Sequence, residues 1–141
     1  MLSDDDLAFL DRQHSAAMIT VGEDGLPKVA RVGVARVDGR LWSSGTAGRV
    51  RTQRLRADPR CVLYVHDVAA GWLAIETTVT VLDGPEVPAQ SVQLFRVMQD
   101  KPEGPLSWFG GELDEATFRQ QMVDERRVIY EFETHKSYGM R

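Results

Sequence analysis

The chain has 141 residues, 43% of them hydrophobic, a size that fits one domain, residues 1–141, with a modest core. Its 17 basic and 21 acidic side chains give a formal net charge of -4, which excludes a nucleic-acid binder that relies on bulk positive charge. No stretch reaches the roughly 18 apolar residues of a membrane span, and the first residues are acidic where a secretory signal is basic. We therefore expect a cytoplasmic protein without a membrane segment.

The first third of the chain alternates short apolar runs with turn signals. Ser3 and the three aspartates after it are typical of a capped helix start, and this helix is expected to end near His14. Gly-Glu-Asp-Gly and Asp-Gly turns then separate apolar runs, and Asp-Gly is a strong hairpin signal. These runs predict a three-stranded antiparallel meander formed by residues 16–21, 29–37 and 41–44.

A change of pattern marks a short helix, which ends at Asp58-Pro59 because the residue before a proline is forced out of helical geometry. The elements expected in this part are a helix at residues 48–57, strands at 60–66 and 71–82, helices at 87–100 and 113–123 with an aromatic loop between them, and a last strand at 127–132. Six strands without βαβ alternation predict a mainly β fold, a six-stranded antiparallel split β-barrel with peripheral helices.

The short helix before Asp58 has an unusual charge pattern. Arg49, Arg51 and Arg54 precede any acid in it, although positive charge at a helix start opposes the macrodipole by about 0.3 to 1 kcal/mol per charge. Projection at about 100° per residue places Arg51 and Arg54 on the arc expected to pack inward. That arc also holds Ala47, Val50, Leu55 and Ala57.

These arginines predict a local phosphate site. Free backbone N–H groups at the helix start and the guanidinium groups would bind the anion together with the hydroxyls of Ser43, Ser44, Thr46 and Thr52. The alternative is a solvated face, or pairing with acids across a subunit contact. The spacing matches neither a P-loop nor GxGxxG, which disfavours nucleotide hydrolysis and a Rossmann cofactor.

The sequence resembles the pyridoxamine 5'-phosphate oxidase-like FMN-binding split-barrel superfamily, and more closely its flavin/deazaflavin oxidoreductase branch that uses coenzyme F420. The resemblance runs from Asp-Leu-Ala-Phe-Leu in the first helix, through the basic segment RVRTQRLRADPR and the Gly-Trp strand, to ERRVIYEF and the closing Tyr-Gly. The basic segment with Asp58-Pro59-Arg60 is its most specific part.

The resemblance implies that the cofactor phosphate is bound by Arg49, Arg51 and Thr52, with Arg54 beside them. Arg51 stands where relatives often have lysine. The ring is implied to lie in a groove at a homodimer interface near Trp72 and Ala74, on the face of their strand that points away from the core. Plain dimer packing is the alternative role of Trp72.

The first hypothesis is an F420-dependent reductase that transfers a hydride from the deazaflavin to an unsaturated small molecule. The alternatives are an FMN-dependent oxidoreductase on the same scaffold and a non-catalytic flavin- or haem-binding protein. The longer acidic tail of F420 would favour further basic residues at the groove mouth, such as Lys28 or Arg31.

The sequence departs from the resembled family at two places, and it lacks the spacing of metal ligands. An Arg-Leu-His segment is missing near the end of the sequence, which argues against pyridoxamine phosphate oxidation itself, and Thr77 stands where relatives usually have glycine. No catalytic residue is assigned. His14, His66 and His135 lack metal-ligand spacing, so no metal is expected.

Overall fold

The structure is a computed structural model that describes residues 2–141. Its main strands are β1 (Ser15–Val21), β2 (Pro27–Gly33), β3 (Ala35–Val37), β4 (Arg40–Thr46), β5 (Arg60–His66), β6 (Trp72–Leu82) and β9 (Arg127–Met140). A separate hairpin consists of β7 (Leu106–Trp108) and β8 (Gly111–Leu113). The helices are α1 (Asp4–Arg12), α2 (Val50–Ala57), α3 (Val87–Gln99) and α4 (Glu115–Asp124).

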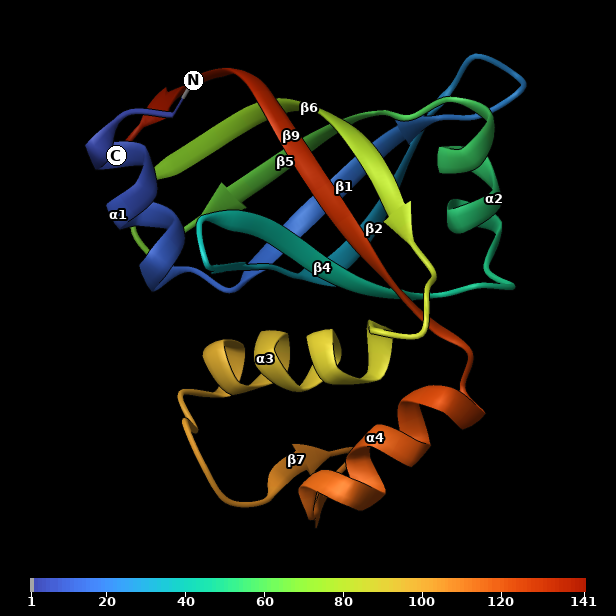
Figure 1. The fold of residues 1–141 in the computed structure, drawn as a ribbon. Helices are drawn as coiled ribbons and strands as arrows, with labels where there is room; N and C mark the ends of the chain where they lie inside the picture. Colours follow the sequence, from blue (N-terminus) through green and yellow to red (C-terminus); the bar gives the residue numbers. More distant parts are fainter. Residues whose placement is uncertain (1) are drawn as a thin grey trace.

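The main strands form one curled antiparallel sheet in the order β2-β1-β5-β6-β9-β4-β3 (Figure 1). This arrangement confirms the antiparallel split barrel with peripheral helices, with seven strands in the sheet where six were expected. β9 also extends to Met140, well beyond the expected end at residue 132, and pairs with both β4 and β6.

Both antiparallel pairings of the expected meander are present, but the run expected as one central strand divides at Val34. Its first half, β2, pairs with β1, and its second half, β3, pairs with β4. The two halves lie at opposite edges of the sheet, so their continuity makes the sheet close on itself. His14 holds this bend: its carbonyl accepts from the Val34 N–H at 3.1 Å, and its Nδ1 lies 3.0 Å from the Val34 carbonyl oxygen.

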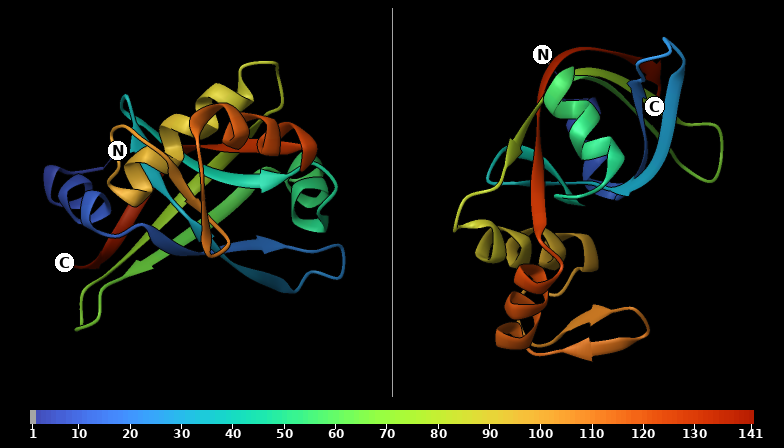
Figure 2. Two further views of the ribbon diagram at one scale, coloured as in Figure 1. Left: turned by 90° about the horizontal axis from the view of Figure 1, so that it is seen from below. Right: turned by 90° about the vertical axis from the view of Figure 1, so that its right-hand side faces the viewer.

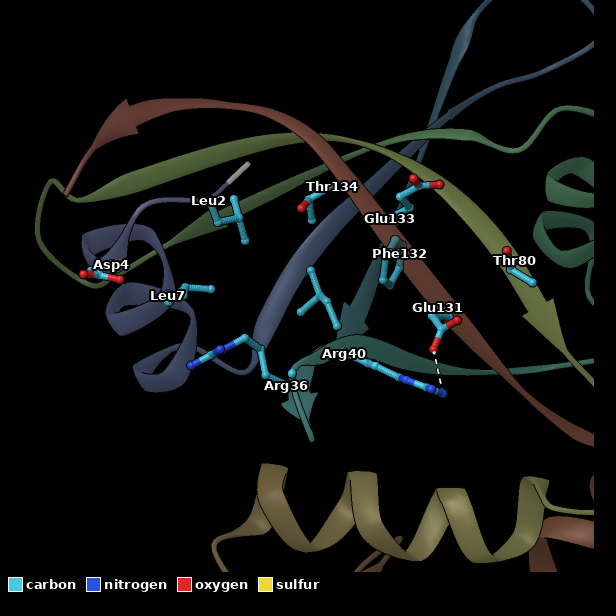
Figure 3. A pocket seen from close by; sticks show the side chains of 12 residues that line it. Leu2, Asp4, Leu7, Arg36, Arg40, Thr80, Glu131, Phe132, Glu133 and Thr134 are labelled. Atoms are coloured by element: carbon cyan, nitrogen blue, oxygen red, sulfur yellow. Dashed lines mark ion pairs between the residues drawn. The ribbon is translucent and has the colours of Figure 1, made fainter.

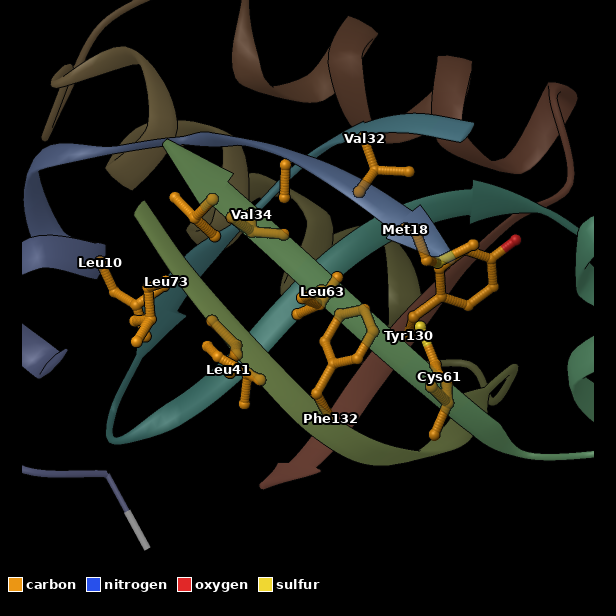
Figure 4. Packing of buried hydrophobic residues seen from close by; sticks show 14 of the residues in the cluster. Leu10, Met18, Val32, Val34, Leu41, Cys61, Leu63, Leu73, Tyr130 and Phe132 are labelled. Atoms are coloured by element: carbon orange, nitrogen blue, oxygen red, sulfur yellow. The ribbon is translucent and has the colours of Figure 1, made fainter. Parts of the chain in front are cut away.

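The barrel interior is filled by apolar side chains from the main strands other than β3, from α1 and from α2 (Figure 4). Leu73, Ile75 and Val79 are buried there, as the alternation in β6 predicted. Cys61 is also buried, and burial raises the pKa of its thiol to about 11. Thr77 is buried at an irregularity in the β6–β9 register, and its hydroxyl donates to the Cys61 carbonyl at 2.8 Å.

The segment between β6 and β9 forms a separate unit beside the barrel. α3 packs on Ala35, Trp42 and Ile129 of the sheet. Beyond α3, residues 100–126 contain the β7–β8 hairpin and α4, which pack on α3 around a cluster of Phe118, Leu106 and Met122. We call residues 100–126 the arm, because Figure 2 shows them projecting from the barrel.

Asp6 ties α1 to the end of β9. Its side chain is 1% exposed, and Oδ2 accepts hydrogen bonds from the Ser137 hydroxyl at 2.7 Å and the Ser3 N–H at 3.1 Å. Oδ1 forms an ion pair with Arg141. Burial raises the pKa of Asp6, but these hydrogen bonds and the Arg141 charge lower it by more, so the net shift is downward.

Replacing Asp6 by asparagine is expected to lower the free energy of unfolding by about 1 to 3 kcal/mol at about pH 7, because the neutral amide weakens the two charge-assisted hydrogen bonds and loses the ion pair with Arg141. The folded-state pKa lies below the ordinary value of 3.8, so this stabilisation is complete above that value and is lost as the pH falls through the folded-state pKa. Urea unfolding should therefore show the difference shrinking at low pH. Asp5→Asn, at an exposed position of the same turn, is the control. A difference independent of pH would contradict this role.

Candidate functional site

The start of α2 lacks the groups that normally neutralise a helix N-terminus. The N-cap residue is Arg49, no side chain caps the helix, and its first turn contains no acidic residue. Uncapped N–H groups and the helix dipole both favour an anion at this position. The start of this helix therefore carries positive side chains and no acid or capping side chain to offset them.

Three arginines at this helix have no carboxylate partner among residues 2–141. Nε of Arg49 donates to Thr46 Oγ1 at 3.3 Å, and Nη1 of Arg54 donates to Thr20 Oγ1 at 3.1 Å. Nε of Arg51 is buried and has no acceptor within the described chain. A buried guanidinium donor without an acceptor is unfavourable, so this atom identifies where a ligand oxygen is needed.

Other arginines of the same segment behave differently. Arg56 pairs with Asp83 at 3.1 Å, and Arg60 pairs with Asp58 at 2.8 Å. The hydrogen bonds from Arg60 lower the pKa of Asp58 to about 2. The segment therefore contains both neutralised arginines and three that remain available for an anion.

Thr52 supports the helix instead of facing a ligand. Its side chain is fully buried, and its hydroxyl donates to the Thr46 carbonyl at 2.7 Å. Because that bond uses the only hydroxyl proton of Thr52, the Tyr130 hydroxyl, 2.5 Å away, is the donor in their mutual hydrogen bond. The expectation that the Thr52 side chain binds phosphate is therefore corrected.

The expected packing face of α2 is also corrected. Thr52 and Leu55 are the buried residues of this helix, whereas Val50 is 68% exposed and Ala57 is exposed. The projection failed because it treated Thr52 as polar, while Tyr130 satisfies its hydroxyl inside the barrel. Arg51 consequently lies at the edge of the packing face, which explains its partial burial.

Two residues that the sequence interpretation missed shape this site from beneath. Tyr130 is fully buried, and its ring crosses β4 at Gly45. A Cβ at Gly45 would lie 2.8 Å from Tyr130 Cε2 and closer still to Cζ and the hydroxyl. Glycine is therefore what allows Tyr130 to reach Thr52. Next to it, the buried hydroxyl oxygen of Ser44 has no partner within the described residues.

A pocket of about 800 Å³ lies between α2 and the β1–β2 hairpin. Its charged lining residues are three basic ones, Lys28, Arg54 and Arg60, and three acidic ones, Glu23, Asp24 and Asp58. Lys28, one of the two additional basic residues expected near the groove mouth, thus shares a pocket with Arg54, although it also pairs with Asp24 at 2.9 Å. Arg31 is not part of this lining.

A second pocket, of about 740 Å³, lies between α1, the β3–β4 hairpin and β9 (Figure 3). Both of its arginines are already paired. Arg36 donates two hydrogen bonds to Asp11, and Arg40 lies 3.6 Å from Glu131. This pocket therefore offers less free positive charge to a phosphate than the region around α2.

Trp72 and Ala74 lie at the other end of the sheet from α2. The Trp72 ring stacks on Tyr64 with centroids 5.9 Å apart, and it meets Tyr138 edge-on at 6.2 Å. Ala74 is only 4% exposed, because it sits between Tyr64 and Tyr138 on the neighbouring strands. Trp72 begins β6 and lies ten residues from its other end at Leu82, about 33 Å along the strand. One chain therefore does not bring Trp72 and the arginines together.

Residues 2–141 contain no group of three or more His, Cys, Asp or Glu side chains that could hold a metal ion. Over the same residues, no helix has the length and apolar character needed to cross a membrane.

Comparisons with known proteins agree with this architecture. The chain has 19% identity to conserved hypothetical protein Rv2991 from Mycobacterium tuberculosis, with a TM-score of 0.76, covering 99% of this chain and 85% of that one. It has 19% identity to a protein named F420 Reductase, with a TM-score of 0.70 and coverage of 97% and 98%. General Stress Protein 26 from Bacillus anthracis has 10% identity and a TM-score of 0.61, with coverage of 94% and 88%. At these identities the likeness concerns the fold.

Among curated proteins, none matches this chain. The family described as Pyridoxamine 5'-phosphate oxidase matches residues 2–138, almost the whole sequence. The match agrees with the curled antiparallel barrel and with the basic helix at its end. The chain therefore belongs to the pyridoxamine 5'-phosphate oxidase family.

Proposed function

We propose that this protein is an F420-dependent reductase, in which the reduced deazaflavin passes a hydride to an unsaturated small molecule. The observation that carries the proposal is the set of three arginines at α2 without carboxylate partners, above all the buried Nε of Arg51. A cofactor phosphate would supply both the missing acceptor and the missing negative charge. Membership of an oxidoreductase family supports the same chemistry.

The chain contributes binding and orientation. Arg49 and Arg51 would bind the phosphate at the start of α2. Arg54 is on the same helix, and its guanidinium donates a hydrogen bond to Thr20 on β1. The hydrogen bond between Thr52 and Tyr130 fixes the helix on the barrel, so the arginines keep their positions. When bound, the deazaflavin supplies the hydride, while the protein orients its ring.

The pocket beside α2 favours F420 over FMN. F420 continues beyond its phosphate into an acidic tail, whereas FMN ends at the phosphate. A space of about 800 Å³ next to the helix offers room for such a tail, and Arg54 is the basic residue of its lining that has no ion pair among residues 2–141. The F420 Reductase with a similar fold supports this choice. An FMN-dependent oxidoreductase is the alternative, because it would use the same phosphate contacts.

We further propose that the protein works as a homodimer in the cytoplasm. The outer face of the sheet carries exposed apolar side chains, including Val29 at 69%, Tyr138 at 46% and Met140 at 56%. Exposed apolar side chains on β2 and β9 favour burial in a subunit contact. A second copy on this face would also give the cofactor groove its other wall, and Trp72 would lie at that contact.

The test is a side-by-side titration of the purified protein with F420 and FMN, followed by turnover of reduced F420 with quinones, enones and tetrapyrroles. We expect F420 to bind more tightly, and its reduced form to be consumed slowly in air until an electron-poor acceptor is added. Strong binding of FMN with no binding of F420 would show that the cofactor assignment is wrong. Binding without reduction of any acceptor would favour a non-catalytic binding protein.

A further inference from the structure

The tip of the β7–β8 hairpin displays an aromatic side chain in an unfavourable backbone conformation. Phe109 and Gly110 form the two-residue turn, with φ of +46° and +81°. Asn-Gly is the pair that such a turn accommodates best, and positive φ is unfavourable for a bulky residue. Phe109 is nevertheless 88% exposed, so the interior of this chain does not require its ring.

The hairpin is built firmly enough to hold Phe109 in place. The neighbouring Trp108 donates from Nε1 to Glu125 at 3.1 Å, and the Arg127 guanidinium lies 5.0 Å from its ring centroid. Trp108 also packs edge-on against Phe118 at 5.5 Å. The exposed ring therefore projects from a fixed support, which reduces the entropy lost when it contacts a partner.

The arm and the exposed sheet face point to the same side of the molecule. Figure 2, right, shows the β7–β8 hairpin projecting toward the side on which β1 and β2 lie. The outer face of β2 exposes Val29 there. A second copy bound to that sheet face would therefore lie beside the hairpin tip.

The charges indicate which part of a second copy the arm would meet. Many charges of both segments are paired within the chain. The side chains without an ion pair among residues 2–141 are four acids and one arginine in the arm, and four arginines and one acid in residues 28–60. The basic segment includes α2 and its unpaired arginines. Complementary potentials of this kind guide association between surfaces.

We infer that in the homodimer the acidic arm of each copy docks beside the basic segment of the other, with Phe109 packing against the second copy near its cofactor site. The inference rests on the homodimer of the proposed function. Each site would then be completed by an element of the other chain. Cofactor binding and dimer formation would be coupled through this contact.

Phe109→Asn separates this role from a role in folding. Asparagine suits the turn, so the unfolding temperature should stay the same or rise, while the dimer dissociation constant, measured by sedimentation without cofactor, should rise about tenfold or more. Val123→Asn, at a position of the same arm that is 53% exposed, is the control and should leave the dimer unchanged. Added salt should also weaken the wild-type dimer.

The outcomes are distinguishable from those of the cofactor test. A monomeric wild-type protein would overturn both this inference and the proposed dimer. A dimer that Phe109→Asn leaves unchanged would overturn the inference alone. Weaker dimerisation in Phe109→Asn together with failure to bind F420 would support the inference and contradict the proposed cofactor.

Discussion

Replacing Arg51 by alanine is expected to weaken cofactor binding by about 1.5 to 3 kcal/mol, roughly 10- to 150-fold in the dissociation constant. The expectation follows from the position of Nε, which is buried and lacks an acceptor in the part of the chain that the structure describes. A phosphate oxygen at this atom forms a charge-assisted hydrogen bond that alanine cannot replace. The fold should be unaffected, because no group among residues 2–141 depends on this side chain for a hydrogen bond. Fluorescence titration of the variant with F420 and FMN measures the loss.

Arg56→Ala is the matched control for this experiment. Arg56 belongs to the same helix and has the same charge, but it is paired with Asp83. Its removal should change cofactor affinity far less than removal of Arg51, and Arg51→Lys should fall between the two because it keeps the charge without the planar fork. If both alanine variants lost the same cofactor affinity, Arg51 would contribute only its positive charge and no specific contact with the phosphate. Unchanged affinity in Arg51→Ala would remove it from the site.

The fold was largely predictable because strand alternation and turn signals are local. The strand at residues 60–66 and the core face of β6 follow directly from the pattern. The division of the second strand at Val34 was not predicted although Gly33 precedes it, because a single glycine inside a strand pattern also fits a bulge or a close backbone approach. Its cause is a pair of contacts with His14, twenty residues earlier in the chain. The glycine indicates that the strand is locally irregular, but the partner that holds the bend lies too far away in the sequence to be identified from it.

The candidate site was predictable only where it depends on charge. Three arginines before any acid in a short helix indicate an anion site, and the structure leaves these three without carboxylate partners. Which hydroxyl faces the ligand was not predictable, because the partner of Thr52 is Tyr130 on the last strand. The alternation of side chains along β6 showed that Trp72 lies on the outer face of the sheet. It could not give the distance between Trp72 and α2, because that distance depends on the register of the strands.

Gly45→Ala is expected to destabilise the protein by about 2 to 3 kcal/mol, because the added methyl group overlaps the Tyr130 ring. Tyr130 is fully buried in the barrel core, so its ring has no free space into which to move. Relief requires either that β4 separate from β9 or that the ring tilt away from Thr52. Both changes shift the start of α2, so the folded fraction of the variant should also bind cofactor less tightly.

Gly48→Ala provides the control for this prediction within the same loop. No atom lies within 4 Å of a Cβ at Gly48, which is exposed, so the substitution should leave stability unchanged or raise it slightly by restricting the unfolded chain. Urea unfolding compares the two variants, and titration with F420 then follows their affinity under conditions where both are folded. A Gly45→Ala protein as stable as the wild type would show that Tyr130 can move without loss. If such a protein also kept its cofactor affinity, the placement of the arginines would not depend on the hydrogen bond between Tyr130 and Thr52.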